Sequence, residues 1–284
     1  MKKDQLKKIY KEKIKKFKNY NYLYFEKNKS EISDADFDNL KKEILDLEKN
    51  YKFLNSKESP SETLGFKPSK TFKKINHKIP MLSLANAFSE EDLVNFEKKI
   101  NNYLDNQNYF QIEYSVEPKI DGISASLIYK NGKFIKGLSR GDGKQGEDIT
   151  ENLMTINDIP KFINDKKFPE EIDIRGEVFI QNSDFKKLKN NFANPRNAAS
   201  GSLRQKNSNE TKKIPLKFIA YTFGHEKNMH INTQSEYLEN LHRWGFKINP
   251  LNKIITGIKD LIKNYNEIEK KRSELDFDID GIVY

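Results

Sequence analysis

The 284-residue chain contains no cysteine. This absence excludes disulfide bonds, thiolate zinc sites and cysteine nucleophiles. It fits a reducing compartment, and we expect a cytoplasmic protein. Histidine is scarce as well, and the four histidines show no ligand-like clustering, so we assign no zinc site.

Long hydrophobic runs are also missing. Hydrophobic residues make up 36% of the chain and charged residues 33%, and no stretch approaches the length that spans a membrane. The lysine-rich N-terminus has no apolar segment behind it, so we expect neither a signal peptide nor a membrane partner. The length allows one large domain or two smaller ones, each with its own core.

Cations outnumber anions, with 51 Lys and Arg against 42 Asp and Glu, for a net charge of +9. A basic surface favours a polyanionic partner such as nucleic acid. Lys, Asn and Ile are all abundant, so codon bias would produce the same excess. The charge therefore supports nucleic-acid binding without establishing it.

The N-terminal part is predicted to be helical. Apolar residues recur at helical spacing within 6–17 and 37–47. The second helix is expected to begin near Ser33, which forms a capping-box pattern with Asp36. A connector containing Ser, Pro and Gly follows at 56–70, so we place the domains at 1–70 and 71–284.

Beyond residue 71 the pattern is mixed. Asn131-Gly132 lies between strand-like runs and predicts a β-hairpin, because both turn residues need positive φ. The other expected elements are strands at 172–180, 216–223 and 277–284, and helices at 90–103, 183–190, 233–244 and 258–273. Strands and helices do not alternate regularly, so we expect an α+β fold with antiparallel sheets flanked by helices. The chain ends inside an apolar strand-like run, so we expect the second domain to be incomplete at its C-terminus.

The most informative stretch is Glu-Pro-Lys-Ile-Asp-Gly at 117–122. A lysine becomes a nucleophile when nearby cations or burial lower its pKa. A preceding strand would hold Lys119, and Gly122 would let a nucleotide approach the backbone. An isolated Lys-x-Asp-Gly is more often a surface turn, so its surroundings decide its meaning.

Those surroundings resemble a known family. Lys-x-Asp-Gly is similar to the first motif of the covalent nucleotidyltransferases, which comprise DNA ligases, RNA ligases and capping enzymes. Four further segments resemble the NAD⁺-dependent DNA ligases in particular, in the family's order and at its approximate spacing: 140–150, 174–179, 193–205 and 277–283. The resemblance covers essentially the whole chain. It implies a helical domain that binds nicotinamide mononucleotide (NMN), followed by an ATP-grasp-like nucleotidyltransferase domain.

The resemblance also implies a reaction. Lys119 attacks the α-phosphorus of NAD⁺, expels NMN and forms lysyl-AMP. AMP then passes to the 5′-phosphate of nicked double-stranded DNA, where the 3′-hydroxyl displaces it during replication or repair. Mg²⁺ or Mn²⁺ would assist, zinc belongs to family domains beyond this chain, and we expect a monomer.

The family assigns carboxylates to several tasks. Asp121 would orient Lys119 and handle its proton or a metal ion, although an aspartate before glycine is also an ordinary turn residue. Glu117 would face the adenine, and Glu177 the ribose hydroxyls or Mg²⁺. A carboxylate among apolar residues is costly to bury unless something binds it, but Glu177 could also point into solvent. Asp121 and Glu177 are possible Mg²⁺ neighbours, and no residue is assigned as a metal ligand.

Other matched residues would bind the nucleotide. The phosphate partners would be three arginines, whose alternative is simple solvation: Arg140, Arg196 and Arg204. Ser83 and Leu84 would line the pocket, and Asp280 belongs to a matched Asp-Gly pair. Tyr221 could stack on adenine, or equally be a core aromatic.

The N-terminal segment points to NAD⁺. The family uses Tyr-His and then Asp-x-x-Tyr-Asp to grip NMN, and the matching residues here are Tyr24, Phe25, Asp34, Phe37 and Asp38. Two phenylalanines replace histidine and tyrosine, which keeps stacking but loses hydrogen bonds worth about 0.5–1.5 kcal/mol each. The alternative is that the aromatic residues only form the core of a helical domain.

Two other functions stay open. One is an ATP-dependent covalent nucleotidyltransferase, against which the N-terminal helical segment argues. The other is a non-catalytic basic fragment that binds nucleic acid in a salt-sensitive way without forming covalent AMP. Two lysines that the family uses to neutralise phosphate charge would lie after Val283 and beyond this chain, so we expect poor nick sealing.

Overall fold

The structure is a computed structural model that describes residues 3–26, 32, 34–54, 56, 59–60, 72–104, 112–188 and 192–284, without the side chains of 24–26, 34 and 35. It divides into two compact units. The first, here called the helical unit, comprises Met1–Ser83 with Arg140–Glu147, and the second, the sheet unit, comprises Leu84–Ser139 with Asp148–Tyr284. The predicted boundary at residue 70 stays a prediction.

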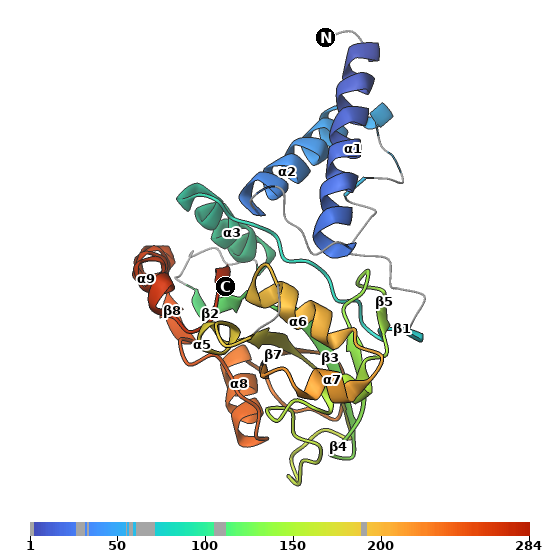
Figure 1. Cartoon of the computed structure of the whole chain (residues 1–284). Helices are drawn as coiled ribbons and strands as arrows, with labels where there is room; N and C mark the ends of the chain where they lie inside the picture. The colour runs from blue at the N-terminus through green and yellow to red at the C-terminus, as the bar shows by residue number, and fades with distance from the viewer. Residues whose placement is uncertain are drawn as a thin grey trace. The chain divides into compact units, whose positions relative to one another are not determined.

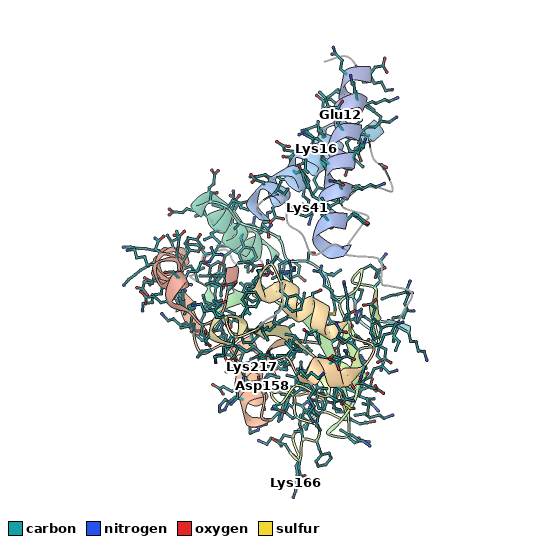
Figure 2. All side chains as sticks on the ribbon, viewed as in Figure 1. Glu12, Lys16, Lys41, Asp158, Lys166 and Lys217 are labelled. Atoms are coloured by element: carbon teal, nitrogen blue, oxygen red, sulfur yellow. The ribbon has the colours of Figure 1, made fainter. Side chains whose placement is uncertain are left out.

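The helical unit contains the two expected helices, α1 (Lys3–Glu26) and α2 (Asp34–Asn50), and a short 3-10 turn, η1 (Lys52–Leu54). Their apolar faces form one cluster made of Tyr10, Ile14, Phe17, Ile44 and Leu54, with Phe37, Leu40 and Leu47 packed against it. Polar side chains such as Glu12 and Lys16 stay exposed on α1 (Figure 2). The helical spacing thus predicted both helices correctly, and the proposed cap at Ser33 lies outside the described residues.

The same unit contains a small β-ribbon. Strand β1 (Lys74–Asn76) pairs antiparallel with β5 (Gln145–Glu147). The Arg-Gly-Asp-Gly turn precedes β5, with Gly141 and Gly143 at φ of 59° and 86°. These glycines adopt backbone angles that other residues rarely tolerate, so this matched motif forms a defined turn.

The sheet unit is built on two antiparallel sheets (Figure 1). The larger has the order β4-β3-β6-β7, with bounds β3 (Ile123–Lys130), β4 (Lys133–Ser139), β6 (Glu171–Ile180) and β7 (Leu216–Lys227). The smaller has the order β8-β2-β9, with bounds β2 (Glu113–Ile120), β8 (Lys253–Thr256) and β9 (Ile279–Val283). The α+β prediction is confirmed.

Helices surround these sheets. Their bounds are α3 (Glu90–Tyr103), α4 (Thr150–Leu153), α5 (Asn182–Phe185), α6 (Pro195–Leu203), α7 (Ser208–Lys212), α8 (Gln234–Arg243) and α9 (Ile258–Lys271), with a final 3-10 turn η2 (Arg272–Glu274). Helix α6 packs against β6 and β3, and α8 packs against β7. Within the described residues, none of the helices has the length and apolar character that a membrane crossing requires.

The hairpin prediction is confirmed, because Asn131 and Gly132 both have positive φ, at 48° and 74°. Helix α3 has the expected bounds, whereas α5 is shorter than expected and β7 continues four residues further, to Lys227. The sequence analysis missed α6. Its signals were present, since Asn194 caps the helix by accepting from Asn197 N and Pro195 occupies the first turn.

Candidate active site

Strand β2 carries Lys119 and Glu117 on one face, two residues apart, because side chains alternate along a strand. The buried residues Val116 and Ile120 anchor the opposite face in the core. Between Lys119 and Ile120 the pairing of β2 with β9 shifts register, a local irregularity of the kind found beside active sites. The strand thus fixes the base of Lys119 while its amine stays accessible.

The Lys119 amine lies against a carboxylate from the far end of the chain. Its Nζ donates to Asp280 Oδ2 at 2.6 Å, and the two side chains are 46% and 23% exposed. This contact follows from strand pairing, because Lys119 is opposite Gly281 in the β2–β9 ladder. Two matched motifs separated by 161 positions therefore meet at one amine.

The structure explains the glycine at position 122 by packing against β6, whereas the sequence suggested room for a nucleotide. A Cβ added there would lie 2.4 Å from Val178 O and 2.8 Å from Glu177 Cγ. The chain can pass so close to β6 only with glycine at this position. The expected approach of a nucleotide to this backbone stays a prediction, and the close approach of β6 is what the structure shows.

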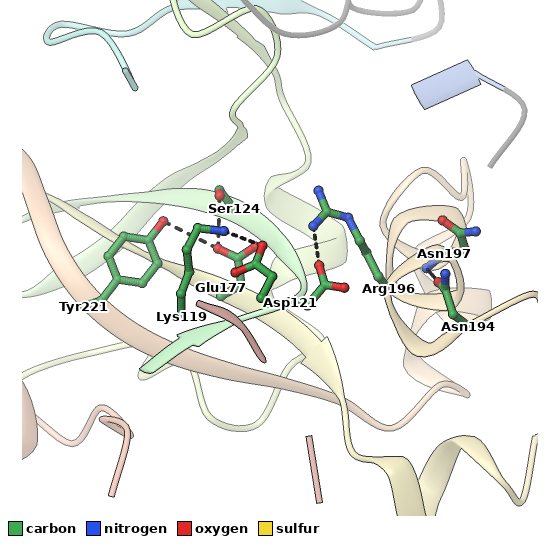
Figure 3. A network of polar contacts seen from close by, with 9 residues as sticks. Lys119, Asp121, Ser124, Glu177, Asn194, Arg196, Asn197 and Tyr221 are labelled. Atoms are coloured by element: carbon green, nitrogen blue, oxygen red, sulfur yellow. Dashed lines mark hydrogen bonds and ion pairs between the residues drawn. The ribbon is translucent and has the colours of Figure 1, made fainter. Parts of the chain in front are cut away.

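Glu177 lies on β6, directly opposite Ser124 of β3. Its Oε2 accepts hydrogen bonds from Ser124 Oγ at 3.0 Å and from Tyr221 OH at 3.5 Å (Figure 3). Burial raises the pKa of this carboxyl to about 7, although the positive charges of Arg196 and Lys119 oppose the rise. A carboxyl whose pKa is raised this far by burial is a candidate functional residue, so we include Glu177 in the candidate site.

Asp121 pairs with Arg196 rather than with Lys119. Arg196 NH1 donates to Asp121 Oδ1, and both side chains are largely buried. Arg196 stands in the first turn of α6, whose start is fixed by the Asn194 cap (Figure 3). The predicted contact between Asp121 and Lys119 is not among the described hydrogen bonds, and the role of Asp121 stays a prediction.

Glu117 is held by two neighbours. Its Oε1 accepts from Ser115 Oγ at 3.0 Å and from Gln234 Nε2 at 2.9 Å. Burial raises the pKa of Glu117, and the bonds from Gln234 and Ser115 oppose the rise. The next carbonyl, of Pro118, accepts from Asn249 Nδ2 at 3.0 Å. Neither Gln234 nor Asn249 was expected at the site, because neither amide stands in a sequence motif that indicates chemistry.

Two of the residues predicted to contact the phosphates or line the nucleotide pocket, Arg140 and Ser83, lie in the helical unit. Arg140 NH2 donates to Ser83 Oγ at 2.8 Å, and Arg140 Nε donates to Met81 O at 3.3 Å. In the sheet unit, Leu84 is 62% exposed and Arg204 directly follows α6. The structure therefore joins Arg140 to Ser83, and the roles of Leu84 and Arg204 toward a nucleotide stay predictions.

The predicted NMN residues are only partly described. Phe37 stacks on Phe17 with ring centroids 5.1 Å apart and packs against the helical core. Asp38 is partly exposed on α2. The side chains of Tyr24, Phe25 and Asp34 lie outside the described residues. Phe37 therefore has the core contacts that the alternative interpretation expected, and its role toward NMN stays a prediction.

Two family models match consecutive parts of this chain. Residues 69–284 match the NAD-dependent DNA ligase adenylation domain, and residues 3–65 match the DNA ligase-like N-terminal NAD⁺-binding domain.

Three relatives illustrate the likeness, and each is named DNA ligase. That of Pelagibacter ubique is 66% identical over 275 residues, covering 97% of this chain and 41% of the relative. Those of Wolbachia pipientis and Parvibaculum lavamentivorans are 45% and 43% identical, covering 96% and 92% of this chain and 40% and 38% of the relatives. The chain thus spans about two fifths of the length of the curated relatives it matches.

Proposed function

Because the chain belongs to the NAD-dependent DNA ligases, we propose that it performs their first chemical step, the transfer of AMP from NAD⁺ to Lys119. The observation that carries this proposal is the amine of Lys119, which is accessible, held near the end of strand β2, and 2.6 Å from Asp280. Glu117 lies two residues before it on the same strand, β2, and Glu177 lies on β6 of the larger sheet, where the charge of Lys119 opposes the burial that raises its pKa.

The covalent step is a displacement at the α-phosphorus of NAD⁺. The nitrogen of Lys119 forms the new P–N bond, and the P–O bond to NMN breaks, so NMN leaves with that electron pair. The ammonium of Lys119 must lose one proton before it attacks and a second one once the P–N bond has formed, and Asp280 is the carboxylate that touches it. Asp280 therefore accepts the first proton, the second passes to solvent, and Arg196 holds Asp121 of the same motif.

The base and the sugar have separate contacts. Glu117 accepts from the adenine amino group, and the Tyr221 ring stacks on the base. Glu177 takes the ribose hydroxyls, because its Oε2 already accepts from the hydroxyls of Ser124 and Tyr221 and can accept from others. This arrangement orients the nucleotide with its α-phosphate toward Lys119.

The phosphates require positive charge. Arg196, which pairs with Asp121 of the lysine motif, is the first candidate, and Arg140 and Arg204 are the other proposed phosphate partners. Ser83 and Leu84 are proposed to line the nucleotide pocket. The guanidinium fork suits a phosphate because it offers parallel N–H donors. Arg196 pairs with Asp121 in the structure, so binding a phosphate would divide its donors between the two anions.

The carboxylates of the candidate site could hold a divalent cation only together with phosphate and water ligands. Mg²⁺ is held by one or two carboxylates together with phosphates and water. The described residues contain no group of three acidic or histidine ligands, so the protein alone does not form a cage. Glu177, in its deprotonated form, and Asp121 are the carboxylates that would hold the ion, which would neutralise phosphate charge.

The N-terminal helices would bind the leaving half of the cofactor. In this proposal Tyr24, Phe25 and Phe37 contact the nicotinamide ring, and Asp34 and Asp38 accept from the ribose. The AMP on Lys119 would then pass to the 5′-phosphate of a nick in double-stranded DNA. The net charge of +9 favours this polyanionic partner.

The test is the intact mass of the chain after incubation with Mg²⁺ and either NAD⁺ or ATP. We expect a gain of one AMP with NAD⁺ only. Lys119→Ala should abolish the gain, and Lys133→Ala on the neighbouring hairpin should leave it unchanged. An adduct from ATP but not NAD⁺ would indicate an ATP-dependent nucleotidyltransferase, and DNA binding without any adduct would indicate a non-catalytic fragment.

A further inference from the structure

Gln234, the first residue of α8, joins the two residues that flank the proposed adenine site. Its Nε2 donates to Glu117 Oε1 at 2.9 Å and to the backbone oxygen of Tyr221 at 2.6 Å. Glu117 belongs to β2 and Tyr221 to β7, strands of different sheets. Gln234 therefore links Glu117, which would contact the edge of the adenine, to Tyr221, which would stack on the face of the ring.

The orientation of this amide is fixed by its partners. Both partners are acceptors, a carboxylate and a carbonyl, so both N–H groups of Gln234 are used. The flipped amide would place its oxygen against two acceptors and would be repelled. The start of α8 is fixed as well, because Thr233 caps the helix by accepting from Glu236 N at 3.2 Å.

The two bonds to Glu117 fall on the same oxygen. Ser115 Oγ and Gln234 Nε2 both donate to Oε1. Among the described residues, no hydrogen bond to Oε2 is found. An ionised carboxylate can only accept. The second oxygen of Glu117 is therefore held as a fixed acceptor for a donor from outside the protein.

We propose that Gln234 is the positioning residue through which Glu117 selects a purine with a 6-amino group over one with a 6-oxo group. The inference rests on the proposed function, in which Glu117 contacts the adenine edge. Adenine presents an N–H donor at position 6, whereas hypoxanthine presents an oxygen there. Hypoxanthine could satisfy Glu117 through its N1–H only if the carboxylate shifted, and Gln234 opposes that shift.

Gln234 also affects the charge of Glu117. Burial raises the pKa of Glu117, and the bond from Gln234 lowers it. Losing that bond should raise the pKa further, so the carboxyl would become protonated at a higher pH. A protonated carboxyl can donate to a 6-oxo group, so the base preference should disappear at a higher pH in the variant than in the unmodified chain. A purely structural role of Gln234 would not shift this pH.

The experiment compares initial rates of lysyl-nucleotide formation from limiting NAD⁺ and from nicotinamide hypoxanthine dinucleotide, followed by intact mass across a pH series. The substitution is Gln234→Met, which keeps the size of the side chain and removes its donors. We expect the preference for NAD⁺ to fall roughly tenfold near neutral pH. The ratio of the two rates cancels any effect on Lys119, which both cofactors share.

Two controls separate selection from general damage. Gln181→Met makes the same substitution at the start of α5, where the side chain makes no capping bond, and it should change neither rate. Asn249→Ala removes the amide that binds the Pro118 carbonyl without touching Glu117, and it should slow both cofactors equally. Thermal unfolding of every variant identifies any that fail to fold.

The outcomes distinguish the two proposals. An adduct that shows no base preference in the unmodified chain, or an equal loss of both rates in Gln234→Met with an unshifted pH profile, overturns the role of Gln234 and leaves the proposed function standing. No adduct from either cofactor contradicts the proposed function, and the role of Gln234 falls with it.

Discussion

The helical unit and the sheet unit are organised by different interactions. The helical unit is held by one apolar cluster whose members come from α1, α2 and η1, close together in the sequence. In the sheet unit, the candidate site consists of ionisable side chains that come from β2 and the turn after it, β6, β9 and α6: Lys119, Asp121, Glu177, Arg196 and Asp280. The helical unit therefore depends on apolar spacing within single helices, whereas the candidate site depends on the register between strands that are distant in the sequence.

The largest expected effect is a loss of stability in the helical unit. Ile44 is fully buried, and Ile44→Ala should leave a cavity that lowers the free energy of unfolding of this unit by about 2–5 kcal/mol. Urea unfolding followed by circular dichroism measures the change, and the exposed Asp46→Ala is the matched control. The only tryptophan, Trp244, lies buried in the sheet unit, so its fluorescence reports that unit separately. An unchanged helical transition would contradict the role of the cluster.

A smaller loss of stability is expected in the sheet unit. Gly122→Ala forces a methyl group against Val178 O, which is backbone and cannot rotate away. We expect a loss of about 1–3 kcal/mol in the Trp244-detected free energy of unfolding. Gly281→Ala is the control, because a Cβ there meets nothing within 4 Å. Equal stability of the two variants would show that the close approach of β6 is unimportant.

These two predictions also show what the sequence could reveal. The helices of the first unit follow from apolar spacing, and the β3–β4 hairpin follows from Asn131-Gly132, because both signals are local. The motif positions of Lys119, Asp121, Glu177 and Asp280 came from family resemblance. That Asp280, and not Asp121, touches the amine depends on the register of β2 against β9, which no local pattern encodes. Gln234 could not be found for the same reason, because this helix residue contacts two strands of different sheets, β2 and β7.

A third prediction sharpens the contrast by using pH. The pKa of Glu177 is raised to about 7 in the folded protein from an ordinary 4.5. The folded state therefore binds more protons than the unfolded state between these values, and stability contributed by the protonated form is lost as pH rises through about 7. Glu177→Gln should raise the melting temperature at pH above this range and change it little in acid. It should also slow adenylation, because the carboxylate is lost.

The control for Glu177→Gln is Glu113→Gln, which removes an exposed carboxylate at the start of β2. It should leave both the pH dependence of stability and the adenylation rate unchanged. A Glu177→Gln protein whose stability rises equally at every pH would show that its gain comes from packing rather than from proton binding.

The smallest expected effect concerns Phe37. Phe37→Tyr restores the residue type that the family resemblance expects, and its hydroxyl could gain one hydrogen bond to the cofactor. The rate of adenylation at limiting NAD⁺ should rise roughly two- to tenfold if the ring reaches the cofactor. The rate with saturating NAD⁺ should stay the same. A loss of stability without any gain in rate would show that Phe37, stacked on Phe17, serves only the helical core.

The most direct test of the account is the position of the AMP. The chain would be incubated with NAD⁺ and Mg²⁺, digested under conditions that preserve the phosphoramidate, and sequenced by tandem mass spectrometry. We predict that all AMP is on Lys119 and that Asp280→Asn, which alters the carboxylate touching its amine, reduces the yield without moving the label. AMP on another lysine, or an undiminished yield in Asp280→Asn, would contradict the assignment of these two residues.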